Sequence, residues 1–252
     1  MLNRTCLNVH KEIKMNKYVV LDIETTGTHP IHSEIIEIGA VYIENGKVTK
    51  TFDELICPTQ DISEYITSIT GITNEMVANS FPVQEVLPRF IEFCEDVPLI
   101  GHNIILFDYR MLKAKANDLG FQFEKSGLDT LVISRKMLQE LPSRRLGQLC
   151  AYYHISLENA HRAYHDAYAT YELFEKLRQQ FESLEPKLFV PQPMKWEVPK
   201  QELLTKKQQA YLESLCDMHH IVLQQDIKRL TKSECSKLID KIILTYGKQR
   251  RL

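Results

Sequence analysis

The chain has few cysteines, and they lie far apart in the sequence. The six cysteines include no C-x-x-C pair, the spacing that is typical of small zinc sites and redox-active dithiols. This pattern argues against a disulfide framework and a cysteine-based zinc site, and it indicates a reducing compartment. We therefore expect a cytoplasmic protein.

Long apolar runs are also missing. None reaches the ~18 residues that a membrane-spanning helix needs, so no membrane partner is expected. Residues 1–16 mix Asn, Arg, Lys and Glu without an apolar core, which is unlike a signal peptide. We expect these residues to form a loose N-terminal extension.

Neither sign of charge is in large excess. The chain has 31 Lys and Arg against 33 Asp and Glu, which gives a formal net charge of −2. Residues 200–252 are basic, with 11 Lys and Arg against 6 Asp and Glu, and the remainder is acidic. Net charge alone does not indicate a nucleic-acid-binding protein, although bound metal ions can invert the field of an acidic site. The basic stretch fits phosphate contacts or an ordinary solubilising surface.

An apolar stretch at residues 18–21 predicts a buried strand, and Asp-Ile-Glu-Thr-Thr-Gly follows it. Side chains alternate along a strand, so Asp22 and Glu24 leave the same face. Two such carboxylates at the end of a buried strand repel each other unless cations lie between them. Gly27 lets the backbone turn and approach a ligand closely. The pattern indicates a divalent-metal site, and the alternative is a hairpin corner with two solvated acids.

The remaining pattern predicts a mixed α/β sheet with helices on both faces. Strands are expected at residues 18–21, 34–43, 47–56, 98–101 and 127–130. Asn45 and Gly46 give a strong signal for a two-residue hairpin turn. Apolar residues at helical spacing predict the helices; these lie at residues 61–67, 73–79, 82–94, 103–119, 130–139, 146–153 and 161–181.

Two further stretches contain candidate site residues. Gly101, His102 and Asn103 end a short strand just before a helix, a common place for ligand-facing groups in α/β folds. Asp108 follows on an apolar helical stretch. There it either needs a partner, such as a metal ion, or is an ordinary exposed acid.

His161 and Asp166 form the last candidate pair. If His161 precedes a helix and Asp166 lies in its second turn, both side chains can face one cleft. The aspartate can then ligate a metal ion while the histidine removes a proton from water. His165 is expected to face outward, and a structural role is the alternative for either histidine.

Together these stretches resemble the three motifs of the DEDDh (DnaQ-like) 3′→5′ exonucleases, which include proofreading subunits and domains of bacterial DNA polymerase III. The motifs occur in order, with suitable intervals, and the resemblance covers about residues 17–180. Residues 69–73 also look like a loop of this family. The resemblance implies a ribonuclease H-like fold with a mixed five-stranded sheet and flanking helices.

The resemblance also implies a mechanism. Four carboxylates would hold two Mg²⁺ or Mn²⁺ ions; they are Asp22, Glu24, Asp108 and Asp166. His161 would act as general base on a water molecule, so activity should fall below about pH 6.5. The products would be a nucleoside 5′-monophosphate and a strand that is one nucleotide shorter.

The resemblance also has implications for substrate binding. Backbone groups after the first strand would approach the terminal nucleotide, and the region of Ile66 and Ile69 would stack on the terminal base without reading sequence. The residues expected to contact the substrate are Thr25, Thr26, Gly27, Ile69, His102 and Asn103.

Four segments are expected in the chain: an N-terminal extension (1–16), an exonuclease domain (17–183), a linker (184–200) and a small helical C-terminal module (201–252). The linker holds four of the ten prolines, which excludes regular structure. Its apolar residues Phe189, Met194 and Trp196 are expected to pack on the first domain rather than to bind a partner. Capping boxes at Thr205 and Thr231 predict two helices in the module.

The expected substrate is single-stranded DNA or a frayed DNA 3′ end, in DNA replication or repair. RNA 3′ ends are an alternative, because the sequence shows no residue that would distinguish a 2′-hydroxyl. A second alternative is a nucleic-acid-binding adaptor that uses the C-terminal module. A third is a proofreading enzyme that acts only when bound to a DNA polymerase.

Overall fold

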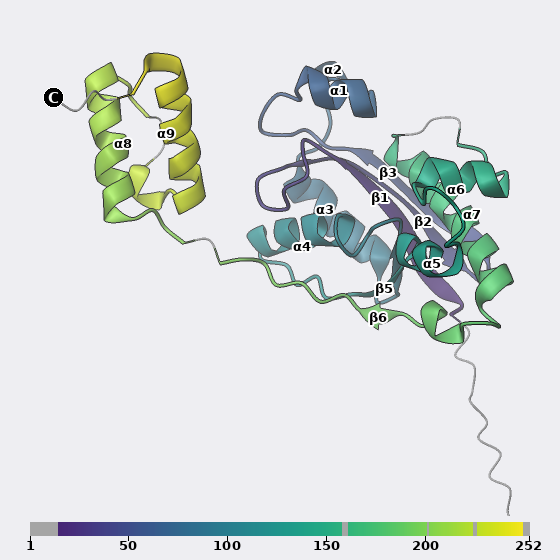
Figure 1. The fold of residues 1–252 in the computed structure, drawn as a ribbon. Coiled ribbons are helices and arrows are strands. Elements are labelled where there is room, and N and C mark those ends of the chain that lie inside the picture. The colour runs from purple at the N-terminus through teal and green to yellow at the C-terminus, as the bar shows by residue number, and fades with distance from the viewer. Residues whose placement is uncertain (1–14, 158–160, 201, 224–225, 249–252) are drawn as a thin grey trace, which may run out of the picture. The chain divides into compact units, whose positions relative to one another are not determined.

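The computed structural model describes residues 15–157, 161–200, 202–223 and 226–248 (Figure 1). Residues 1–14 of the expected N-terminal extension lie outside the described residues. The chain divides into two compact units, Met1–Val198 and Pro199–Leu252. Within the described residues, no helix is long and apolar enough to span a bilayer.

The first unit is built on one mixed sheet. In the described residues the strands follow the order β3-β2-β1-β4-β5-β6. Their bounds are β1 (Lys17–Thr25), β2 (Ile35–Glu44), β3 (Lys47–Leu55), β4 (Leu99–Gly101), β5 (Ser126–Asp129) and β6 (Gln192–Pro193). β1 pairs antiparallel with β2 and parallel with β4, so the predicted mixed α/β fold is confirmed.

The turn between β2 and β3 is the predicted two-residue hairpin. Asn45 and Gly46 have φ values of 53° and 74°, and Glu44 pairs with Lys47 across the turn. Two successive positive φ values match the twist of the flanking strands, which is why Asn-Gly is favoured here.

The sheet has one strand more than the five that were expected. β6 pairs antiparallel with β5, and Met194 N donates a hydrogen bond to Lys125 O at 2.9 Å. A Cβ on Gly127 would lie 3.0 Å from the sulfur of Met194, so this glycine leaves room for the methionine. A two-residue strand that contains a proline has no alternating pattern, and the sequence therefore does not reveal it.

Residues 184–200 contain regular structure, unlike the irregular linker that the prolines indicate. A 3-10 helix, η1 (Pro186–Phe189), precedes β6, and its proline stands in the first turn, where a missing N–H costs nothing. Phe189 and Met194 are buried, and Trp196 packs against the same cluster as Met194. The prediction that these side chains pack on the first unit is confirmed.

Helices cover both faces of the sheet (Figure 1). Their bounds are α1 (Glu64–Thr70), α2 (Asn74–Val77), α3 (Val83–Cys94), α4 (Asp108–Asp118), α5 (Thr130–Met137), α6 (Leu146–Tyr153) and α7 (Ala163–Phe181). Alternation along β1 decides which face each side chain joins. Val19 and Leu21 pack in a cluster with α3 and α4, whereas Tyr18 and Val20 pack with α5, α6 and α7.

The predicted start of α4 at residue 103 is wrong, because the helix begins at Asp108. Asn103 has φ +70°, which is incompatible with a right-handed helix. The N–H groups of Asn103 and Ile105 instead donate to the carboxylate of Asp129. Asp108 is therefore the first residue of a helix rather than an acid within one.

The second unit is a small helical module with its own apolar cluster, as expected. It contains α8 (Lys206–His219), a 3-10 helix η2 (Ile227–Arg229) and α9 (Lys232–Tyr246). Thr205 and Thr231 each form the predicted capping box. Leu212, Leu215 and Ile242 are buried between the helices.

Candidate active site

The site begins on β1, where Asp22 and Glu24 leave the same face. Across the antiparallel pair on β2, Asp22 lies opposite Gly39 and Glu24 lies opposite Glu37. A Cβ on Gly39 would lie 2.0 Å from the backbone nitrogen of Tyr164, so only glycine lets the first turn of α7 rest here. The missing side chain thus places the start of α7 beside the two acids.

Glu37 fixes the start of α7, a role that its place in the sequence does not predict. Its buried carboxylate accepts hydrogen bonds from Arg162 Nε at 2.9 Å, Arg162 Nη2 at 2.7 Å and Ala163 N at 2.9 Å. A charged residue within an otherwise apolar strand was the available signal, because such a residue needs a partner. The partner, 125 positions away, could not be read from that pattern.

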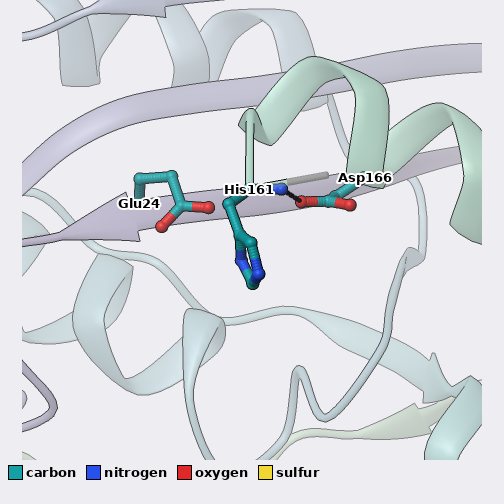
Figure 2. A group of neighbouring side chains, drawn as sticks. All are labelled: Glu24, His161 and Asp166. Atoms are coloured by element: carbon teal, nitrogen blue, oxygen red, sulfur yellow. Dashed lines mark hydrogen bonds between the residues drawn. The ribbon is translucent and has the colours of Figure 1, made fainter. Parts of the chain in front are cut away.

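His161 and Asp166 are brought together as the sequence predicts. His161 precedes α7 with φ +66°, and its backbone N–H donates to Asp166 Oδ2 at 2.8 Å. His161 is exposed and Asp166 is buried. One ligand atom from each of Glu24, His161 and Asp166 lies within 4.8 Å of the others (Figure 2). His165 is exposed, in line with the expectation that it faces outward.

Asp108 joins the cluster from α4. Its Oδ1 accepts a hydrogen bond from the backbone N–H of Ile23 at 3.2 Å, so the carboxylate lies against β1 between Asp22 and Glu24. The side chain is buried, with 2% of its surface exposed. Four acids from β1, α4 and α7 therefore meet at one end of the sheet.

Burial and mutual repulsion disfavour ionisation of these acids. Burial raises the pKa of Asp22 well above its ordinary value, and the carboxylates of Asp108, Asp166 and Glu24 raise it further. Burial, Asp166 and Glu37 together raise the pKa of Glu24 to about 8. Burial also raises the pKa of Asp108 and of Asp166. Divalent cations that prefer oxygen ligands would relieve this repulsion. The four carboxylates therefore suit Mg²⁺ or Mn²⁺ as bound ions.

Three of the four acids, all except Asp108, line a pocket of about 460 Å³. Five of the predicted site residues line it, namely Asp22, Glu24, His102, His161 and Asp166. Asn103 lines a neighbouring pocket instead, and Ile69 is 40% exposed at the end of α1 without lining either one.

The turn after β1 is held by its own side chains. Thr25 Oγ1 donates to Gly27 O at 2.6 Å, and Thr26 Oγ1 accepts from Glu34 N at 2.9 Å. Thr26 N donates to Glu34 O, so this N–H is already occupied within the protein. The two hydroxyls thus shape the turn that carries Gly27.

The loop after β4 is held by Asp129, whose role is likewise not predicted by the sequence pattern. Asp129 Oδ1 accepts from Asn103 N and from Leu131 N, both at 2.9 Å. His102 uses both ring nitrogens within the protein: Nδ1 lies 2.9 Å from Thr130 Oγ1, and Nε2 lies 2.9 Å from Arg144 O. Burial lowers the pKa of His102. An acid at the end of a strand and before a helix was the signal for Asp129, since it caps α5.

The family model described as Exonuclease, RNase T type, matches residues 19–174. The chain belongs to this exonuclease family. The resemblance to the DEDDh exonucleases that the motifs indicate is therefore confirmed. The ribonuclease H-like fold also agrees with solved exonucleases. Exonuclease I of E. coli with a dA16 oligonucleotide has a TM-score of 0.59 at 23% identity, covering 69% of this chain and 42% of that one.

A second solved exonuclease and several bacterial polymerases are also similar. Exonuclease X in complex with 5′ overhanging duplex DNA has a TM-score of 0.54 at 23% identity, covering 65% of this chain and 92% of that one. The PolC-type DNA polymerase III of Caldanaerobacter subterraneus subsp. tengcongensis is 42% identical over 168 residues, which is 67% of this chain. That of Pediococcus pentosaceus is 32% identical over 248 residues, which is 93% of this chain. The exonuclease chain spans only 12% and 17% of the lengths of these polymerases.

Proposed function

We propose that this chain is a metal-dependent 3′→5′ exonuclease that releases nucleoside 5′-monophosphates from DNA 3′ ends. The observation that supports it best is the convergence of Asp22, Glu24, Asp108 and Asp166 beside the exposed imidazole of His161. These groups come from three separate elements, and their crowding disfavours the ionised state unless cations are bound.

The four carboxylates would hold two Mg²⁺ or Mn²⁺ ions, which are hard cations that prefer carboxylate oxygens. When bound, such ions stabilise negative charge on a phosphodiester and lower the pKa of water. Asp108 and Asp166 are fixed for this role by backbone N–H groups, those of Ile23 and His161.

His161 would take the proton from the water that attacks phosphorus. The P–O3′ bond then breaks, the shortened strand leaves with a 3′-hydroxyl after it takes up a proton, and the released nucleotide keeps the phosphate on its 5′ carbon. The exposed position of His161 suits it to exchange that proton with solvent. One of its ring nitrogens also lies within 4.8 Å of a carboxylate oxygen of Glu24 and of Asp166, so direct metal ligation is the competing role.

The other predicted substrate residues would act around this centre. The turn of Thr25, Thr26 and Gly27 continues β1 next to Glu24 and would lie along the terminal nucleotide. The exposed Ile69 would stack on a base. His102 would act mainly by holding its loop in place, because both of its ring nitrogens are engaged.

The names of the relatives support DNA as the substrate and replication as the setting. PolC-type enzymes are DNA polymerases, and the two solved exonucleases are described with DNA or an oligodeoxynucleotide. A DNA polymerase is accordingly the protein partner that we propose, with proofreading as the shared task.

An end-labelled substrate tests the proposal. Purified chain is incubated with 5′-labelled single-stranded DNA or RNA in Mg²⁺, Mn²⁺ or EDTA, beside the Asp22→Ala variant. We expect a descending ladder from the 3′ end of DNA that needs metal and is absent with the variant. Immediate release of labelled mononucleotide without a ladder, which indicates cleavage from the 5′ end, or cleavage that persists in EDTA, would contradict the proposal.

A further inference from the structure

A second pocket, of about 560 Å³, opens beside the acidic one and contains three arginines. Arg135 comes from α5, while Arg144 and Arg145 come from the segment that leads into α6. No aspartate or glutamate lines this pocket. We call it the arginine pocket.

The two pockets share a wall. His102, Arg145 and Leu146 line both of them. One side of this wall is acidic, with Asp22 and Glu24, and suits cations, while the other side is basic and suits anions. A ligand with phosphates spaced along a chain can occupy both sides, one phosphate at the metal-binding acids and another at the arginines.

Among the residues that the structure describes, no acid forms an ion pair with a pocket arginine. In the part of the chain that the structure describes, the arginines paired with a carboxylate are Arg89, Arg162 and Arg178. Arg144 Nη2 donates to Gln139 O at 2.6 Å, but its Nε is buried and has no hydrogen-bond partner within the described residues. Guanidinium groups that lack a carboxylate partner keep donors for an anion, and hydrogen bonds from such a charged donor are strong.

The segment that carries these arginines is tied to the active-site loop. A carbonyl oxygen only accepts, so His102 Nε2 donates to Arg144 O, and the same imidazole contacts Thr130 through Nδ1. The loop after β4 and the segment before α6 are thereby fixed to each other. A site that is held in place before binding loses less entropy when the ligand arrives.

We propose that the arginine pocket binds the phosphate that lies one nucleotide on the 5′ side of the phosphodiester held by the acids. This inference rests on the proposed 3′→5′ exonuclease activity. In that reaction the departing 3′-terminal nucleotide carries only the phosphate that is attacked. A second phosphate close enough to enter the arginine pocket must therefore belong to the retained strand. The pocket thus binds the strand that remains after cleavage.

Equilibrium binding tests the pocket without any chemistry. Fluorescence anisotropy of labelled oligothymidylate (dT8) in EDTA compares the wild type with Arg135→Gln and Arg144→Gln. Arg89→Gln on α3 is the matched control, because it removes the same charge outside both pockets. We expect about tenfold weaker binding for each pocket variant and a salt dependence that is shallower by about 0.7 in log–log slope per lost contact. Unchanged affinity in both pocket variants would overturn the proposal, whether or not the chain is an enzyme.

A pair of short substrates then tests which phosphate is bound. The dinucleotide TpT has only the phosphate to be cleaved, and pTpT adds one phosphate on its 5′ side. We expect the wild type and Arg89→Gln to cleave pTpT with a kcat/KM about tenfold above that for TpT, and this ratio to approach one in Arg144→Gln. Because the readout is a ratio within each variant, a general loss of folding or activity does not change it.

The two outcomes separate the two proposals. If the wild type cleaves TpT and pTpT equally well, or if Arg144→Gln keeps the full ratio, the pocket does not bind that phosphate, while the exonuclease proposal stands. If the wild type cleaves neither dinucleotide and also leaves 5′-labelled single-stranded DNA intact, the exonuclease proposal fails. The position that is assigned to the pocket phosphate fails with it.

Discussion

The carboxylate of Glu37 on β2 accepts two hydrogen bonds from the guanidinium of Arg162, at 2.9 Å and 2.7 Å. Glu37 is fully buried, and its other oxygen accepts from Ala163 N. The pair therefore joins the sheet to the residue that follows His161, four positions before Asp166. Through this contact a side chain outside the proposed catalytic set determines where two of its members lie.

Glu37→Gln tests this positioning role. The amide keeps the size of the side chain but loses the charge, and one of its two accepting positions becomes a donor. We expect kcat on single-stranded DNA to fall about 10–100-fold with little change in KM, because a small displacement of catalytic groups is costly. Glu54→Gln, which disrupts the surface pair with Arg89, is the matched control and should leave both constants unchanged. A rise in KM with kcat retained would assign Glu37 to binding instead.

Asp22→Ala should abolish hydrolysis and leave the fold intact. The carboxylate is central to the acid cluster, and its removal also removes repulsion from Asp108, Asp166 and Glu24. We expect activity to drop at least about 1,000-fold, while thermal unfolding in EDTA shows equal or higher stability. Activity that survives in a metal titration would remove Asp22 from the site.

The metal-free chain should lose stability as the pH rises. The pKa of Glu24 is raised from an ordinary value of 4.5 to about 8, and those of Asp22 and Asp166 move in the same direction. Between these pH values the folded chain keeps protons that the unfolded chain has released, so the free energy of unfolding falls as the pH rises.

Thermal unfolding measures this effect. In EDTA the Tm should decrease from about pH 4.5 to about pH 8, and Mn²⁺ should raise the Tm more at pH 8 than at pH 5. The double variant Asp22→Asn/Glu24→Gln should show a flatter profile and a smaller response to Mn²⁺. A Tm in EDTA that rises across this window would contradict the crowding of the acids.

Substitution of His161 and substitution of His165 should have very different effects on turnover. His161→Ala should slow turnover by about 10²–10⁴-fold, because the variant lacks the group that takes the proton from water. His165→Ala is the matched control, since His165 is exposed four positions away on α7. Loss of activity in His165→Ala with retention in His161→Ala would show that the roles are reversed.

Much of the site was predictable from the sequence because its signals are local. Asp22 and Glu24 follow from alternation along one strand, and Asn45-Gly46 identifies its own turn. The position of His161 just before a helix that contains Asp166 follows from the apolar spacing of α7.

The parts that the sequence did not reveal depend on contacts between distant residues. Glu37 and Arg162 are 125 positions apart, and Asn103 and Asp129 are 26 apart. The Asp129 contact stops α4 from beginning at residue 103, where helical spacing alone would place its start. The position of β6 likewise depends on its pairing with β5 and on the room that Gly127 leaves for the side chain of Met194. The two residues of β6 do not indicate a strand by themselves.

The central claim is that four acids from β1, α4 and α7 converge on divalent cations. Anomalous diffraction from crystals of the wild-type chain with Mn²⁺ and thymidine 5′-monophosphate tests it most directly. We predict Mn²⁺ peaks bounded by the carboxylates of Asp22, Glu24, Asp108 and Asp166, with the nucleotide phosphate against them. Ordered nucleotide without Mn²⁺ at these carboxylates, or Mn²⁺ bound only elsewhere, would contradict the account.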